Sequence, residues 1–248
     1  FCNIDLLDEK FETKRNQYVG VKDGRIAYIG ASAPEEDFGE RYDGRHRLLM
    51  PAFYNVHSHA PMTLLRGYAE NLPLQRWLGE KVFPFEDQID DEAAYYGTLL
   101  AISEMLASGT ASFSDMYFFF GGMVPAILES GIKCNLSRGL TVFDDSDYTD
   151  LPAYRDNVRL RGEWNGANNG RLIGDLCIHG EYTSNPKIVE AVAQHARETG
   201  ARIQIHLSET QTEHEECKGR HGLTPAAYME KHGIFDSPTT AAHCVWLE

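Results

Sequence analysis

The sequence predicts an α/β protein in which a small all-β module precedes a parallel sheet built from βα units. Three observations lead to this prediction. From Leu48 onward, short apolar runs alternate with segments of helical periodicity, a pattern typical of βα units. The length of 248 residues is close to the roughly 250 residues of a (β/α)8 barrel. The composition, 42% hydrophobic and 24% charged, is that of an ordinary globular protein.

The first stretch contains short β-prone runs that are separated by turn signals. Gln17–Val21 and Ile26–Ile29 flank an Asp23-Gly24 pair, and Asp-Gly between alternating apolar runs strongly favours a hairpin. We therefore assign residues 1–49 to a β module and residues 50–248 to the barrel-like domain.

Six strands are predicted in the second domain, with helices between them. One helix covers Glu92–Ser108, and another covers Ile188–Thr199 after the N-terminal signal Asn185-Pro186. The six strands are Leu48–His57, Ala111–Met116, Lys133–Leu140, Leu172–His179, Arg202–Leu207 and Thr240–Val245. Six βα steps do not close an eight-stranded barrel, so either the chain is truncated or the sheet is open.

Charge and composition limit the possible partners and the compartment. The formal net charge is −14 and the basic residues form no stripe, which argues against nucleic-acid and anionic-membrane binding. No apolar run approaches the roughly 20 residues of a spanning helix, and no secretory signal is recognisable at Phe1. Five cysteines without close pairing favour a reducing compartment, so the cytoplasm is expected.

Four histidines stand at or near the ends of predicted strands. His57 and His59 point to the same side because side chains alternate along a strand. His206 ends the fifth strand and His243 lies in the sixth. The carboxyl ends of parallel strands are where (β/α)8 enzymes build their active sites, so these side chains are expected to converge.

Three neutral imidazoles suit a borderline metal such as Zn²⁺, and an open coordination position would make the site catalytic. Imidazole also suits Fe²⁺ or Mn²⁺, so the residues alone do not decide the metal. Glu209, three residues after His206, is the expected acid–base group. A lone His-Xaa-His is weak evidence, and a hydrogen-bonded structural pair is the alternative; the combination with His206, Glu209 and His243 favours a metal site.

These motifs resemble those of the 5-methylthioadenosine/S-adenosylhomocysteine deaminase family, within the triazine hydrolase and cytosine deaminase-like amidohydrolases. The resemblance begins in Met50–Gly67, which contains both His57 and His59, and it covers essentially the whole chain. The other matching segments are Trp77-Leu78, Pro84-Phe85-Glu86-Asp87, Asp115-Met116-Tyr117, Ser137-Arg138-Gly139-Leu140, His206-Leu207-Ser208-Glu209-Thr210 and Ala242-His243-Cys244-Val245.

The resemblance implies a (β/α)8 TIM-like barrel of the metal-dependent hydrolase type, with one zinc ion per subunit and a small flanking β-sandwich built from both chain ends. The implied zinc ligands are His57, His59 and His206. The family's fourth ligand, an aspartate after strand eight, has no counterpart here, so we expect that the chain is truncated after about strand six. Strand four ends in Cys177-Ile178-His179 without the bridging lysine of binuclear relatives, which favours a single metal.

The resemblance also implies roles for the remaining site residues. Glu209 matches the proton shuttle and His243 the partner of the attacking water. Glu86 matches a residue that binds ribose hydroxyls, while Arg138 and His179 match residues lining the substrate pocket. Taken without the resemblance, Glu86 is a favourable acid at a helix start and Arg138 a partner for a nearby acid.

The expected activity is the zinc-dependent hydrolytic deamination of an adenosine-type nucleoside by a homo-oligomer. The alternatives are another amidohydrolase, such as a guanine or cytosine deaminase or a triazine chlorohydrolase, and a non-catalytic zinc-binding barrel. A ribose-binding carboxylate at Glu86 would be useful for nucleosides and has no evident use for a free base. The sequence does not identify the 5′ group of the substrate. His46, His195, His214, His221 and His232 lie in polar or helical contexts and are expected at the surface.

Overall fold

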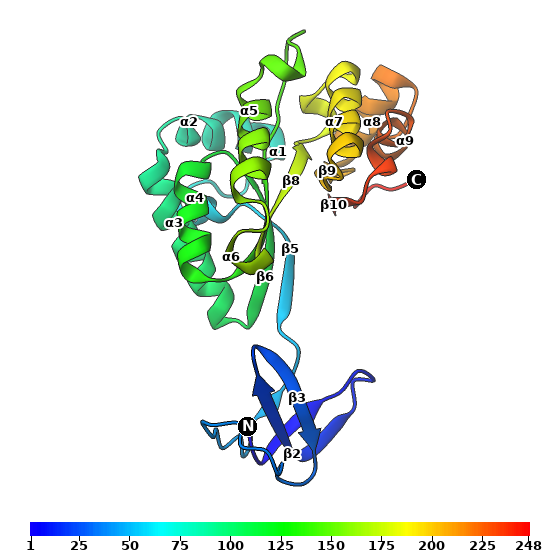
Figure 1. The fold of residues 1–248 in the computed structure, drawn as a ribbon. Helices are drawn as coiled ribbons and strands as arrows, with labels where there is room; N and C mark the ends of the chain where they lie inside the picture. Colours follow the sequence, from blue (N-terminus) through cyan, green and yellow to red (C-terminus); the bar gives the residue numbers. More distant parts are fainter. The chain divides into compact units, whose positions relative to one another are not determined.

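A computed structural model describes residues 1–248, which form two compact units, Phe1–Ala52 and Phe53–Glu248 (Figure 1). No helix in either unit combines the length and the apolar character needed to cross a membrane.

The first unit is a four-stranded sheet with the order β3-β2-β1-β4. Its β2–β3 hairpin turns at Asp23 and Gly24, which both have positive φ angles (51° and 71°), as a two-residue type I′ turn requires. The predicted hairpin is therefore present, and Ile4, Leu6 and Val19 form the small core of this unit. The strands are β1 (Ile4–Leu7), β2 (Thr13–Lys22), β3 (Arg25–Gly30) and β4 (Leu48–Leu49).

The second unit contains six parallel strands that are neighbours in the order of the chain. This arrangement confirms the predicted succession of βα units, and all six strands direct their carboxyl ends to the same edge. The strands are β5 (Phe53–Ser58), β6 (Thr110–Tyr117), β7 (Lys133–Arg138), β8 (Leu172–Ile178), β9 (Ile203–Leu207) and β10 (Thr239–His243).

The predicted strand Leu48–His57 is wrong as one element. Leu48–Leu49 pairs with β1 of the first unit, whereas Phe53–Ser58 pairs with β6 of the second. Pro51 lies between these two segments and has no backbone N–H to offer a sheet, which accounts for the interruption.

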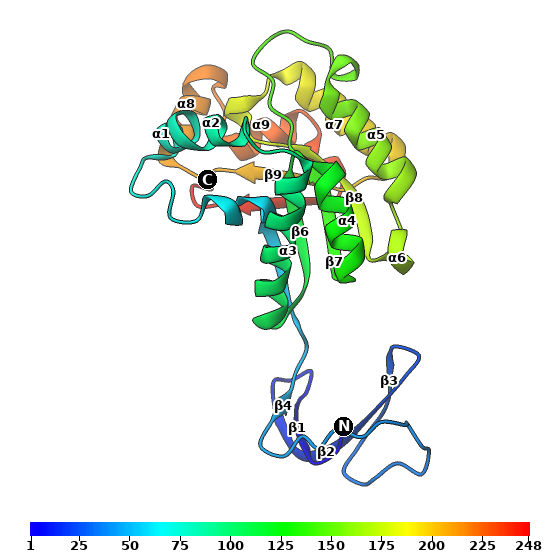
Figure 2. The same cartoon turned by 90° about the vertical axis from the view of Figure 1, so that its left-hand side faces the viewer.

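Helices flank the six-stranded sheet (Figures 1 and 2). As predicted, Asn185 caps α7 by accepting a hydrogen bond from Ile188 N. Gly131 and Gly200 end α4 and α7 with positive φ angles. The longer helices are α3 (Asp91–Ala107), α4 (Phe120–Ser130), α5 (Pro152–Arg159), α7 (Pro186–Thr199), α8 (Gln211–His221) and α9 (Pro225–Lys231).

The short helical segments lie mostly in the connections that follow the strands, and those after β5 approach the site described below. They are η1 (Ala60–Leu65), α1 (Leu74–Trp77), η2 (Leu78–Val82), α2 (Phe83–Glu86), η3 (Tyr148–Asp150), η4 (Leu160–Trp164), α6 (Ala167–Gly170), η5 (Glu181–Thr183) and η6 (Ile234–Asp236).

The core of the second unit lies between the sheet and these helices. β8 and β9 pack against α7 through residues such as Leu176, Ile203 and Val192, all of them fully buried. The prediction that His214 lies at the surface is wrong, because this residue faces inward from α8 and its side chain is only 2% exposed. The sequence around His214 predicts a helix but does not indicate on which face of that helix His214 lies.

Candidate active site

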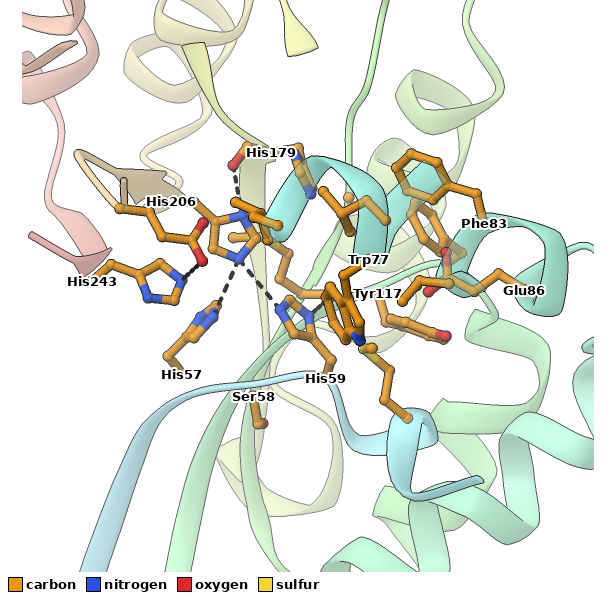
Figure 3. Close-up of a pocket in the computed structure, with 18 of the residues that line it drawn as sticks. His57, Ser58, His59, Trp77, Phe83, Glu86, Tyr117, His179, His206 and His243 are labelled. Carbon is orange, nitrogen blue, oxygen red and sulfur yellow. Dashed lines mark hydrogen bonds and ion pairs between the residues drawn. The ribbon is translucent and has the colours of Figure 1, made fainter. Parts of the chain in front are cut away.

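Four histidines from three strands converge at the carboxyl edge of the sheet (Figure 3). His57 and His59 come from the end of β5, His206 from β9 and His243 from β10. His206 Nε2 lies 3.2 Å from His57 Nε2 and 3.3 Å from His59 Nε2. One ring nitrogen each of His57, His206 and His243 also lies within 4.8 Å of the others. The structure thus brings together the histidines that the sequence placed at strand ends.

Backbone carbonyls determine which ring nitrogen carries the proton in two of these imidazoles. His59 Nδ1 lies 2.6 Å from Met116 O, and His206 Nδ1 lies 2.8 Å from His179 O. A carbonyl oxygen only accepts hydrogen bonds, so Nδ1 is the protonated nitrogen and Nε2 carries a free lone pair. The neutral rings therefore turn two lone pairs towards each other, an arrangement that a cation between them would stabilise.

Burial keeps the imidazoles in this neutral form. It lowers the pKa of His57 to about 4, with the neighbouring histidines contributing in the same direction. Burial and the same neighbours lower the pKa of His206 still further, and burial lowers the pKa of His59. All three rings are thus neutral at pH 7, which is the form that binds a metal.

The spacing of the ring nitrogens fits a tetrahedral metal site. Two ligands that each lie about 2.1 Å from a tetrahedral ion are about 3.4 Å apart, close to the observed separations from His206 Nε2. An all-nitrogen donor set suits Zn²⁺ and other transition metals rather than Mg²⁺ or Ca²⁺. The residues present therefore fit a divalent transition-metal ion.

Glu209 and His243 lie beside the cluster on two turns with unusual backbone conformations. Ser208, His243 and Cys244 have positive φ angles of 51°, 71° and 54°. His243 Nε2 lies 3.7 Å from Glu209 Oε1. Burial raises the pKa of Glu209, while His243 acts in the opposite direction. A carboxyl group with a raised pKa next to a candidate metal site is suited to proton transfer.

A cavity of about 340 Å³ extends from the histidines to Glu86. Figure 3 shows the imidazoles at one end and Phe83 and Glu86 at the other, with Trp77 between them. The wall between the two ends is formed mainly by apolar and aromatic side chains, as is usual for a small-molecule site. These side chains are Met62, Leu74, Trp77, Leu78, Val82, Phe83, Met116, Tyr117 and Phe118.

Glu86 supplies a carboxyl group at the far end of the cavity. It is 9% exposed, and burial raises its pKa. Burial and the neighbouring Glu86 also raise the pKa of the Tyr117 hydroxyl. A largely buried carboxyl group is thus the polar group at an end of the cavity that is otherwise apolar, and the Tyr117 hydroxyl beside it is itself buried.

The two other residues expected in the pocket differ in position. His179 lines the cavity, and its Nδ1 lies 3.0 Å from Thr183 Oγ1. Arg138 is not among the lining residues: its guanidinium donates to Asp156 Oδ2 at 3.1 Å and lies over the ring of Phe118, which lines the cavity. A direct contact between Arg138 and substrate stays a prediction.

Two buried carboxylates that support the site were missed by the sequence reasoning. Asp115 accepts hydrogen bonds from Ser58 Oγ and Ala60 N, which lie on either side of His59. Glu213 accepts from the backbone of Ser208 and Glu209. The pattern Thr210-Gln-Thr-Glu213 is a helix-capping signal that could have drawn attention to Glu213. Asp115 lies in a segment that resembles the family, but that segment does not indicate what its side chain binds.

Comparisons with known proteins agree with this geometry. The model of the amidohydrolase family matches residues 48–248. The 5-methylthioadenosine/S-adenosylhomocysteine deaminase of Syntrophomonas wolfei is 41% identical over 233 residues, which are 93% of this chain and 53% of that protein. The 5′-deoxyadenosine deaminase of Methanothermobacter thermautotrophicus is 36% identical over 94% of this chain and 55% of that protein. The chain thus spans a little over half the length of these relatives, and the resemblance inferred from the sequence is confirmed.

Solved structures show the same fold. A crystal structure of an adenosine deaminase from Xanthomonas campestris with bound zinc aligns with a TM-score of 0.81 and 25% identity, over 98% of this chain and 57% of that one. A guanine deaminase from C. acetobutylicum aligns with a TM-score of 0.86 at 19% identity, over 99% and 62% of the two chains, which is evidence for the fold alone. The predicted barrel-type fold is therefore confirmed.

Proposed function

Because this chain belongs to the amidohydrolase family, we propose that the protein catalyses the hydrolytic deamination of an adenosine-type nucleoside to the inosine product and ammonia. The observation that carries the proposal is the convergence of His57, His59 and His206 next to Glu209, at one end of a cavity with Glu86 at the other. The names of the relatives, which act on 5-methylthioadenosine, S-adenosylhomocysteine or 5′-deoxyadenosine, support this substrate class.

We propose His57, His59 and His206 as the ligands of one divalent metal ion, with zinc as the first candidate because a structural neighbour holds zinc. Iron and manganese are the alternatives for the same donors. When bound, such an ion supplies Lewis acidity and makes a nucleophilic water available at neutral pH. The remaining functions belong to side chains of this chain.

Glu209 is the proposed proton shuttle. Its carboxylate takes a proton from the attacking water and delivers it to the ring nitrogen next to C6 while the oxygen adds to C6. The remaining proton of the added hydroxyl then passes to the amino group, the C6–N bond breaks, and ammonia leaves as C6 becomes a carbonyl. The raised pKa of Glu209 suits a group that must both accept and release a proton. His243, 3.7 Å from Glu209, is placed to orient the water and the carboxylate.

The cavity between the two ends has the character that a nucleoside requires. Trp77, Phe83 and Tyr117 offer aromatic surface for the flat purine and the sugar face. The Glu86 carboxylate would accept hydrogen bonds from ribose hydroxyls, and His179 would contact the base near the metal ligands. Arg138 would act on the substrate indirectly, through the Phe118 ring over which its guanidinium lies. A direct contact with the substrate would require its hydrogen bond to Asp156 to break.

The second candidate is another amidohydrolase reaction on a free base or triazine, which the structural neighbours named guanine deaminase and atrazine chlorohydrolase bring into consideration. Glu86 favours the nucleoside, because a buried carboxyl at the far end of the cavity has no evident partner on a bare ring. A non-catalytic metal-binding barrel is the third possibility. Homo-oligomer formation and a cytoplasmic location also stay predictions from the sequence.

Ammonia release by the metal-loaded protein tests the proposal. The substrates are 5′-methylthioadenosine, S-adenosylhomocysteine, 5′-deoxyadenosine, adenosine, guanine and cytosine, with Glu209→Gln as the control for proton transfer. We expect release from the adenosine compounds and a loss of about 100-fold or more in kcat in the variant. Ammonia release from guanine or cytosine alone would favour the second candidate. No ammonia release from any of these compounds, with metal shown to be bound, would favour the non-catalytic metal-binding barrel.

A further inference from the structure

We propose that Glu213 is a positioning residue that fixes the backbone from which Glu209 reaches the reaction centre. The inference rests on the proposed role of Glu209 in proton transfer. It adds a residue that does not line the cavity and that belongs to the next helix, α8.

The Glu213 carboxylate binds both backbone amides of the turn between β9 and α8. Its Oε1 accepts from Ser208 N at 3.1 Å, and its Oε2 accepts from Glu209 N at 2.7 Å. Ser208 has a φ angle of 51°, in a left-handed region that residues other than glycine, asparagine and aspartate seldom adopt. Because Glu213 is only 2% exposed, water does not readily replace it in these two hydrogen bonds.

These contacts differ from ordinary helix capping. Thr210 is the N-cap of α8 and accepts a hydrogen bond from Glu213 N through Oγ1. In a capping box, the acidic residue at the third helical position returns the bond to the backbone N–H of the N-cap itself. Here the hydrogen bonds reach the two preceding residues instead, and one of these is Glu209. The carboxylate therefore holds the proton-transfer residue in addition to starting the helix.

The same turn is joined to the strand that carries His243. Ser208 O accepts hydrogen bonds from Val245 N at 3.0 Å and Trp246 N at 2.9 Å. Glu213 on one side and the segment after β10 on the other thus fix the Ser208 peptide groups. The 3.7 Å contact between Glu209 Oε1 and His243 Nε2 depends on both turns, so Glu213 helps to set it.

The sharpest variant is Glu213→Gln, which keeps the size of the side chain. Both carboxylate oxygens act as acceptors from separate N–H groups, whereas a carboxamide has one acceptor and would turn its NH2 towards the other N–H. Loss of one contact lets the turn shift, and a displacement of about 1 Å at a reacting group can cost on the order of 100-fold in rate.

The test compares four metal-loaded variants, Glu213→Gln, Glu209→Gln, Glu215→Gln and Thr210→Ala, in ammonia release from the best adenosine substrate. Glu215→Gln is the matched control, since Glu215 is an exposed residue of the same helix and the substitution removes the same charge. Thr210→Ala removes the cap and so reports what weakening the start of α8 does by itself. Metal content, melting temperature and hydrogen–deuterium exchange of the segment 208–210 are measured for each variant.

For Glu213→Gln we expect a fall in kcat of about 10- to 100-fold, a KM within about 3-fold, unchanged metal content and faster exchange at the turn. Adding this change to Glu209→Gln should cause no further loss. Unchanged kcat in Glu213→Gln, or an equal loss in Thr210→Ala with the same fall in melting temperature, would overturn the inference. Full activity of Glu209→Gln would instead overturn the proposed function.

Discussion

The strands β9 and β5 both end in candidate metal ligands, yet they are held in place in different ways. All five residues of β9 are buried, and the strand pairs with β8 on one side and β10 on the other. No residue of β5 is fully buried, and its pairing with β6 is interrupted by two register shifts. Packing of the strand therefore positions His206, whereas His57 and His59 must be positioned by other interactions.

For His59, these interactions are hydrogen bonds to residues of β6. Asp115 Oδ2 accepts from Ser58 Oγ at 2.9 Å and from Ala60 N at 2.6 Å, so one oxygen holds the residues on both sides of His59. The next residue, Met116, provides the carbonyl that binds the imidazole Nδ1. The comparison indicates that a ligand on an edge strand is fixed by a few polar contacts, and a ligand on a central strand by the core.

The largest expected effect is on stability and concerns β9. Ile205→Ala removes a fully buried side chain next to His206 and should cost about 2–5 kcal/mol in the free energy of unfolding. Val56→Ala is the matched change on β5, where the side chain is 63% exposed, and should cost less than about 0.5 kcal/mol. Urea unfolding of both variants measures the difference. Equal costs would show that the two strands are held in the same way.

The second prediction concerns metal affinity and β5. Asp115→Leu removes both acceptor contacts beside His59 and should weaken metal binding by about 10- to 100-fold, or about 1.4–2.8 kcal/mol, as is typical when a group supporting a ligand is lost. Competition with a chelator of known affinity measures this change.

Asp115→Asn is the control, because the same oxygen accepts both hydrogen bonds and Oδ1 has no partner. An asparagine that keeps its oxygen in the Oδ2 position retains these contacts, so its metal affinity should stay close to that of the unchanged protein. If the asparagine variant bound metal as weakly as the leucine variant, the loss of affinity would be due to the lost charge and not to the lost hydrogen bonds.

The same contrast separates what could be predicted from the sequence from what could not. His57, His59, His206 and His243 could be placed together because strand periodicity and the common direction of parallel strands are local patterns that determine where strand ends lie. The strand around Pro51 was drawn too long, because apolar character continues across the point at which the chain passes from one sheet to another.

The supporting carboxylates could not be assigned in the same way. Asp115 and Glu213 bind backbone amides, which every residue except proline carries, so the identity of their partners leaves no trace in the sequence. The turn held by Glu213 further depends on a positive φ angle at Ser208. This conformation is uncommon for serine, so the sequence does not predict it. Arg138 illustrates the same limit, since only the structure shows that Asp156 engages its guanidinium.

The third prediction is a pH dependence that concerns the imidazoles at the ends of the two strands. Burial lowers the pKa of His57 to about 4 and that of His206 further in the same direction. In the metal-free protein, the unfolded chain takes up protons at these residues as the pH falls below about 6.5, while the folded chain does not until near pH 4 for His57. Their contribution to the free energy of unfolding is therefore present above pH 6.5 and is lost as the pH falls towards 4.

Asp115 acts in the opposite direction, because burial raises its pKa to about 7 and the folded chain keeps a proton that the unfolded chain releases. The stability of the protein must therefore be compared with that of His57→Asn at each pH, so that the Asp115 contribution largely cancels. Urea unfolding after removal of metal should show the unchanged protein losing stability relative to the variant between pH 6.5 and 4.5. A difference that is constant with pH would mean that His57 is protonated as easily in the folded chain as in the unfolded one, and that the β5 ligands are less protected from solvent than the structure indicates.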